Sequence, residues 1–153
     1  MKIFLLIASV LVMSFSGCAK EEKGCTPVDP QVEETQIINY AIANGMTVVK
    51  HPSGMFYQII DAGTGLSPTT NATIKAIYTG KLLNGTIFDY ETMEATLSGL
   101  IEGWQIGMPL IKKGGKIKLI IPSALAYGCN GNSNKKIGAN QVLFYDITLV
   151  DVK

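Results

Sequence analysis

Arginine is absent from this 153-residue chain, histidine occurs once and cysteine three times. All thirteen basic residues are therefore lysines, and they face twelve acidic residues, for a formal net charge of +1. A nearly neutral chain without arginine lacks the basic surface that binds phosphate backbones, so we expect no nucleic-acid partner. The single histidine, His51, and the three scattered cysteines do not form a metal-binding pattern, and we expect no metal and no cofactor.

The N-terminal apolar run, Ile3–Met13, follows Lys2 and is about 11 residues long, whereas a membrane-spanning helix needs about 20. Its length is typical of a signal peptide, which we place at residues 1–17. The stretch Phe15-Ser16-Gly17-Cys18 resembles the lipobox of bacterial lipoproteins, although leucine is usual where Phe15 stands. The resemblance implies that Cys18 is acylated and anchors the protein to a membrane. An ordinary signal peptide with a cysteine near its cleavage site is the alternative.

Residues 18–28 carry Lys, Glu, Gly and Pro without apolar periodicity, which predicts a polar tether. Its Lys-Glu-Glu-Lys stretch also resembles the export tags of some surface lipoproteins. We therefore expect a lipid-anchored protein of the cell envelope, in the outer membrane and facing either the periplasm or the surface. Cys25 lies in this tether and Cys129 in a distant loop; we expect two free thiols, and a disulfide is the alternative in an oxidising compartment.

Residues 29–53 predict a helical extension and a connector. Asp29 suits the N-cap and Pro30 the first helical position, while Asn44-Gly45 provides a stop. One apolar stripe is expected from Ile37, Ile38, Ala41 and Ile42. We expect this helix to pack on its own domain; dimerisation is the alternative, and the oligomeric state is unknown from sequence.

Residues 54–153 show strand patterns in four segments and helical character in one. The predicted strands are Met55–Ile60, Ala72–Tyr78, Lys116–Ile121 and Gln141–Val152. The predicted helix, Ile101–Leu110, should end or distort at Pro109, which lacks an N–H donor. Strands around one short helix indicate an α+β fold with a mostly antiparallel sheet.

Several blocks of this region occur in the order and spacing of one known family. They are Tyr78–Asp89 (YTGKLLNGTIFD), Leu100–Trp104 (LIEGW), Lys112–Lys116 (KKGGK), Ile121–Gly128 (IPSALAYG) and Leu143–Leu149. Together they resemble the FKBP-type peptidyl-prolyl isomerases. The resemblance implies a sheet wrapped around one short helix and an enzyme that isomerises proline-containing polypeptides, assisting the folding of exported proteins. It also implies that FK506-like macrolides are possible ligands.

Transferred position by position, the resemblance implies one shallow apolar pocket. Its substrate-binding residues are Tyr78, Phe88, Asp89, Leu100, Ile101, Trp104, Tyr127, Ile137 and Tyr145. The catalytic subset is Asp89, Tyr127 and Phe88. Trp104 forms the floor, while the main-chain N–H of Ile101 and the hydroxyl of Tyr127 donate to a bound carbonyl. Without the resemblance, the aromatic residues read as an ordinary core and Asp89 as a turn cap.

The sequence departs from the family pattern in two places. The segment Met93–Leu97 lacks the aromatic residues that many members carry there, so we expect a pocket that is more open on that side. The loop at Ile137–Asn140 lacks the paired prolines of many members, and the preceding Lys135 and Lys136 are expected only to solvate the loop. These departures leave a second hypothesis open, a binding or chaperone lipoprotein with little isomerase activity. A surface lipoprotein that interacts with a host is a third.

Overall fold

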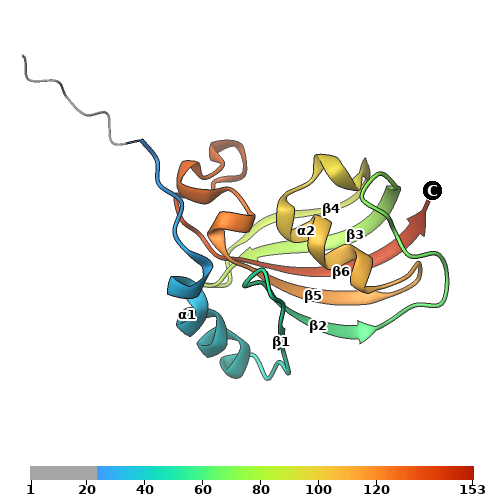
Figure 1. Cartoon of the computed structure of the whole chain (residues 1–153), viewed down its shortest axis with the longest axis horizontal. Helices are drawn as coiled ribbons and strands as arrows, with labels where there is room; N and C mark the ends of the chain where they lie inside the picture. The colour runs from blue at the N-terminus through green and yellow to red at the C-terminus, as the bar shows by residue number, and fades with distance from the viewer. Residues whose placement is uncertain (1–23) are drawn as a thin grey trace, which may run out of the picture.

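The computed structural model describes residues 24–153, which form one six-stranded antiparallel sheet with two α-helices (Figure 1). The sheet order is β1-β2-β5-β6-β3-β4. The strands are β1 (Val49–Lys50), β2 (Phe56–Asp61), β3 (Thr73–Leu82), β4 (Ile87–Thr96), β5 (Lys116–Ile121) and β6 (Leu143–Val152). The helices are α1 (Pro30–Ala43) and α2 (Glu102–Gly107). The predicted signal peptide, Cys18 and the first part of the tether lie outside the described residues.

The two faces of the sheet bury different helices, because successive side chains of a strand point to opposite faces. On one face, Trp104 of α2 packs in the main core with strand residues such as Leu119. On the other, Ile37 of α1 packs with Ile120 and Phe144. In Figure 1, α2 lies over the middle of the sheet and α1 beside its β1–β2 end. Within residues 24–153, no helix is long and apolar enough to cross a membrane.

The four predicted strands are present as β2, β3, β5 and β6, with some ends moved by a few residues. Along β6 alternate residues are buried in the core that also holds Trp104: Leu143, Tyr145, Ile147 and Leu149. The sequence analysis did not delimit β4 as a strand, and the reason is visible in the structure. As an edge strand it pairs on one side only, with β3, and none of its side chains is fully buried. It therefore lacks the apolar alternation that marks a half-buried strand.

The predicted helix Ile101–Leu110 changes conformation around Pro109, as expected, and its α-helical part is Glu102–Gly107. α2 ends at Gly107 and a 3₁₀ turn, Met108–Leu110, follows it, as the missing N–H of Pro109 requires. The Asn84-Gly85 pair lies in the three-residue loop that closes the β3–β4 hairpin, between Leu82 and Thr86. The N–H of Gly85 donates to the Leu82 carbonyl, and Gly85 adopts a φ of +90°, as in a type I turn followed by a left-handed residue.

α1 begins and ends where its capping residues predict. The Asp29 carboxylate accepts the N–H of Gln31 at 2.8 Å, and the helix stops at Ala43. The predicted apolar stripe is half wrong, because Ile38 and Ile42 are 39% and 71% exposed. Residues four apart share a helix face, and the buried row is Glu33, Ile37 and Ala41.

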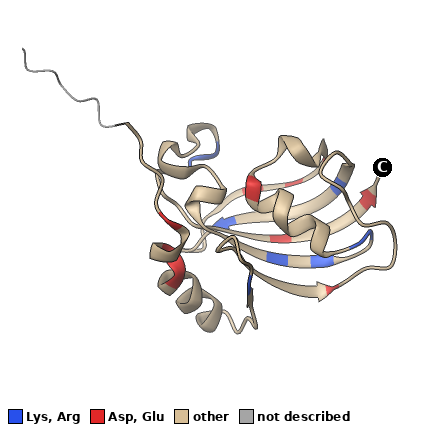
Figure 2. Ribbon diagram, viewed as in Figure 1, with Lys and Arg blue, Asp and Glu red and all other residues tan. Residues whose placement is uncertain are grey.

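Glu33 is a buried acid that joins α1, whose acidic positions are red in Figure 2, to a residue 90 positions later in the sequence. Its side chain is almost inaccessible to solvent, and its Oε2 accepts the N–H of Ser123 at 2.7 Å. Ser123 opens the 3₁₀ turn Ser123–Leu125 that follows β5. A buried carboxylate needs such a donor, because an unpaired one would lose its hydration without compensation. The extension is therefore bound to the loop that leads to Tyr127.

The expectation of two free thiols is wrong, because the structure joins Cys25 and Cys129 in a disulfide. The chain before α1 returns toward the loop after Tyr127, and the two Cα atoms lie 5.5 Å apart, within the usual range for disulfides. Together with the Glu33–Ser123 hydrogen bond, the cross-link attaches the N-terminal segment on both sides of Tyr127.

Replacing Glu33 with alanine should lower the free energy of unfolding by about 2–3 kcal/mol, since it leaves the Ser123 N–H buried without an acceptor. The control is Glu34→Ala, because Glu34 makes only an exposed ion pair with Lys50, worth less than about 1 kcal/mol. Urea denaturation of the two variants measures the difference. Equal losses would contradict a structural role for the Glu33 contact.

Candidate active site

The strand register assembles one wall of a cavity. Asp89, Glu91 and Met93 of β4 stand opposite Gly80, Tyr78 and Ala76 of β3. Residues two apart on a strand share a face, so the three β4 side chains lie on the face that carries Tyr78. The same face is covered by α2, which supplies Trp104.

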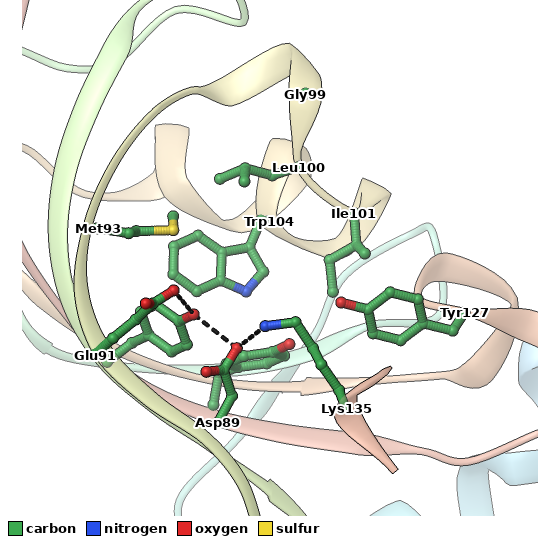
Figure 3. Close-up of a pocket in the computed structure, with 11 residues that line it drawn as sticks. Asp89, Glu91, Met93, Gly99, Leu100, Ile101, Trp104, Tyr127 and Lys135 are labelled. Carbon is green, nitrogen blue, oxygen red and sulfur yellow. Dashed lines mark hydrogen bonds and ion pairs between the residues drawn. The ribbon is translucent and has the colours of Figure 1, made fainter. Parts of the chain in front are cut away.

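The cavity encloses about 310 Å³ between this wall, α2 and two loops (Figure 3). β6 contributes Tyr145, and the segment just before α2 contributes Leu100 and Ile101. The loops after β5 bring Tyr127 and Lys135 to the other side. The complete lining is Tyr78, Asp89, Glu91, Met93, Gly99, Leu100, Ile101, Trp104, Tyr127, Lys135 and Tyr145.

Aromatic rings meeting edge to face form the floor of the cavity. The Trp104 ring centroid lies 5.1 Å from that of Tyr78 and 5.4 Å from that of Tyr145, with interplanar angles of 84° and 88°. Phe88 meets Tyr145 at 5.6 Å and 86°. Gly80 permits this last contact, because a Cβ there would lie 2.7 Å from the Phe88 ring. Edge-to-face pairs add stability beyond that of area burial, so the floor is a rigid apolar surface.

Tyr78 also brings the polar groups of the cavity together. Its hydroxyl lies 2.7 Å from Oδ2 of Asp89 and 2.8 Å from Oε1 of Glu91. Lys135, from the loop, forms an ion pair with the same Asp89 oxygen, as Figure 3 shows. The apolar floor is thus bordered on one side by two carboxylates, a hydroxyl and an ammonium group.

The surroundings shift the titration of these groups in opposite directions. Burial, followed by hydrogen bonding to the two carboxylates, raises the pKa of Tyr78 far above its ordinary value, so the hydroxyl remains a donor. Burial also raises the pKa of Tyr145. Burial alone would raise the pKa of Asp89, but hydrogen bonds from Lys135 and Tyr78 outweigh it and lower that pKa. Asp89 therefore stays ionised near neutral pH.

The structure brings seven of the nine predicted site residues to the cavity lining. The other two, Phe88 and Ile137, lie elsewhere. Phe88 packs against Tyr145 and borders a neighbouring hollow beside Lys135. Ile137 is 4% exposed and belongs to the core, where its main chain pairs with Asn132.

Three side chains that line the cavity were not predicted from the sequence: Glu91, Met93 and Lys135. The strand alternation starting from Asp89 could have found Glu91 and Met93, had β4 been recognised. Lys135 lies in a 3₁₀ turn, Ser133–Lys135, and no periodic signal predicts where its side chain points. It contacts the site acid and does not merely solvate the loop. Among the described residues, no group of three metal-ligating side chains gathers.

An antiparallel sheet, a short helix across it and an aromatic cavity between them define an FKBP-like domain. A family model described as FKBP-type peptidyl-prolyl cis-trans isomerase matches residues 65–150. The chain is 42% identical over 106 residues to FkpA of Escherichia coli K12, covering 66% of this chain and 38% of that protein. It is 38% identical over 112 residues to the outer membrane protein MIP of Legionella longbeachae, covering 69% and 47%.

Solved structures agree with these sequence matches. The crystal structure of Escherichia coli FkpA superposes with a TM-score of 0.71 at 37% identity, covering 82% of this chain and 61% of that one. A Pseudomonas syringae peptidyl-prolyl isomerase gives 0.68 at 26% identity, covering 84% and 98%. The chain belongs to the FKBP-type peptidyl-prolyl cis-trans isomerase family. It spans about half the length, or less, of the curated relatives named above.

Replacing Lys135 with methionine should raise the pKa of Asp89, because burial is then opposed only by the hydrogen bonds from Tyr78 and the Tyr90 backbone. In the native protein the lowered pKa makes the ionised acid stabilising above the unfolded value, and this stability is lost as pH falls through the folded value. NMR titration of the Asp89 carboxyl carbon measures the shift. Lys136→Met is the matched control, and an unchanged Asp89 titration in Lys135→Met would contradict the ion pair.

Proposed function

We propose that the protein is a peptidyl-prolyl cis-trans isomerase that acts on proline-containing polypeptides, with the aromatic cavity as its active site. The observation that carries the proposal is the floor of Trp104, Tyr78 and Tyr145 beside an ionised acid, in a chain of this family. In this function Asp89 and Tyr127 take the catalytic roles. Phe88 supports Tyr145 from behind, and Ile137 supports the loop from the core.

The reaction needs no nucleophile. The amide resists rotation by about 18–20 kcal/mol because its C–N bond has partial double-bond character, and an unaided X-Pro bond isomerises in tens to hundreds of seconds. A catalyst must bind the twisted amide better than the planar one. Twisting decouples the nitrogen from the carbonyl and reduces the amide dipole, so transfer from water to an aromatic surface favours the twisted form.

Two donors are placed to hold a substrate carbonyl over this floor. Ile101 is the N-cap of α2, and its carbonyl accepts the N–H groups of Trp104 and Gln105. Its own N–H makes no hydrogen bond within the described part of the chain. The Tyr127 hydroxyl points into the cavity beside Ile101, on the side facing Glu91 and Met93 (Figure 3). A carbonyl held between them would be fixed while the proline ring turns over Trp104, which orients the bond that rotates.

Tyr127→Phe should lower kcat/KM for a proline peptide about two- to tenfold, the effect of losing one hydrogen bond that contributes about 0.5–1.5 kcal/mol. A protease-coupled assay of the full chain in detergent measures this rate. Tyr90→Phe is the control, because Tyr90 is 74% exposed on the same sheet and should retain the rate. If the native chain shows no rate above buffer while its Trp104 fluorescence still reports peptide binding, the binding or chaperone alternative replaces the enzyme. FK506 competition shows whether macrolides share the site.

We further propose that the chain is a lipid-anchored protein of the cell envelope that assists the folding of exported proteins. The apolar run before Cys18 and the lipobox-like stretch support this location, as does the relative named an outer membrane protein. More than one acyl chain on a residue gives lasting anchoring, since each buried methylene adds about 0.8 kcal/mol.

Cys18→Ser should abolish labelling by a fatty-acid analogue and move the protein out of the membrane fraction. Cys25→Ser, in the same segment, should retain both the label and the membrane location. Membrane retention of an unlabelled Cys18→Ser protein would contradict a lipid anchor at this position. Protease treatment of intact cells then separates a periplasmic from a surface location.

A further inference from the structure

Glu91 is a cavity residue to which the proposed reaction gives no role. It stands opposite Tyr78 in the β3–β4 register, between Asp89 and Met93 on the wall of the cavity. Met93, the next residue of β4 on this wall, begins the segment 93–97 that lacks aromatic residues. Figure 3 shows the Glu91 carboxylate at the near edge of the cavity, with Met93 above it.

The hydrogen bonds of Tyr78 leave Glu91 with spare acceptor capacity. A tyrosine hydroxyl carries one proton and can donate to only one carboxylate at a time, yet both Asp89 and Glu91 lie within 2.8 Å of it. Asp89 has a second partner in Lys135. Within residues 24–153, Glu91 has no donor other than Tyr78. Its carboxylate is therefore the group at the cavity that can accept a further cation.

Charge at the cavity points the same way. Asp89 and Glu91 contribute two negative charges and Lys135 one positive charge to the lining, which leaves one negative charge without compensation. Lys136 borders the neighbouring hollow instead. A concave site with a net negative charge and low-dielectric walls attracts a cation more strongly than an open surface does.

We propose that Glu91 is a specificity-determining residue that favours X-Pro segments carrying lysine or arginine next to the proline and disfavours aspartate or glutamate there. The proposal rests on the proposed isomerase function of the same cavity. Met93, two residues along the wall, offers apolar surface for the methylene stem of the basic side chain. Long basic side chains bind in this way, with the stem on apolar surface and the charged end at a polar group.

The test compares proline tetrapeptides that differ only in the residue before proline: leucine, lysine or glutamate. A second set varies the residue after proline. The full chain should show a kcat/KM for the lysine peptide about two- to fivefold above that for the glutamate peptide in at least one set, as an ion pair of exposed groups gives. High salt should reduce this ratio, because it screens the pair.

Glu91→Gln should lower the lysine-to-glutamate ratio toward one, and Glu91→Lys should invert it. The matched control is Glu94→Gln. Glu94 lies on the other face of β4, where it pairs with Lys153 at 2.7 Å, and this variant should keep the native ratio.

The leucine peptide distinguishes a failure of the proposed isomerase function from a failure of the proposed role of Glu91. If the native chain does not isomerise it, the proposed function fails. If the native chain isomerises it with a lysine-to-glutamate ratio near one, or if Glu91→Gln leaves a larger ratio unchanged, the role of Glu91 is overturned and the isomerase stands. Should a Glu91 variant fail to fold, the native ratio and its salt dependence still decide between these outcomes.

Discussion

The contact of Trp104 with Tyr78 and Tyr145 holds the functional part of this fold together. α2 is only six residues long, too short to be stable without packing, and its buried tryptophan fixes it to the sheet at ring distances of 5.1 and 5.4 Å. The same rings form the floor of the cavity. Stability and the proposed binding surface therefore depend on one cluster, and the strand register that places Tyr78 beside it also places Asp89 and Glu91 at its edge.

Much of the fold follows from local sequence. The cap at Asp29 and the stop at Asn44-Gly45 define α1, and alternation along β6 gives the correct buried face. β4 was not predicted, because an edge strand with no fully buried side chain shows no alternation of apolar and polar residues. The Cys25–Cys129 pairing escaped for another reason. It joins residues 104 positions apart. Only the complete fold brings such distant residues together, and local sequence patterns do not predict it.

The candidate site was predictable where a family resemblance fixed individual positions, and less so elsewhere. Trp104 and Tyr127 reach the cavity as the resemblance implies, whereas Ile137 is in the core. Lys135 reaches Asp89 from an irregular loop, and loops carry no periodicity from which a direction can be inferred. The structure thus shows that the apolar pocket has a charged border, in which one lysine faces two acids. The pocket is therefore not purely aromatic.

The central claim is that the aromatic cavity lowers the barrier to rotation of an X-Pro bond. Magnetisation exchange by NMR between the cis and trans signals of a proline peptide measures that rotation directly, without a coupling protease. With the full chain present well below the peptide concentration, the account predicts exchange between the two signals at a rate far above that of the peptide alone. Broadened peptide signals without cis–trans exchange would show binding without catalysis and would contradict the account.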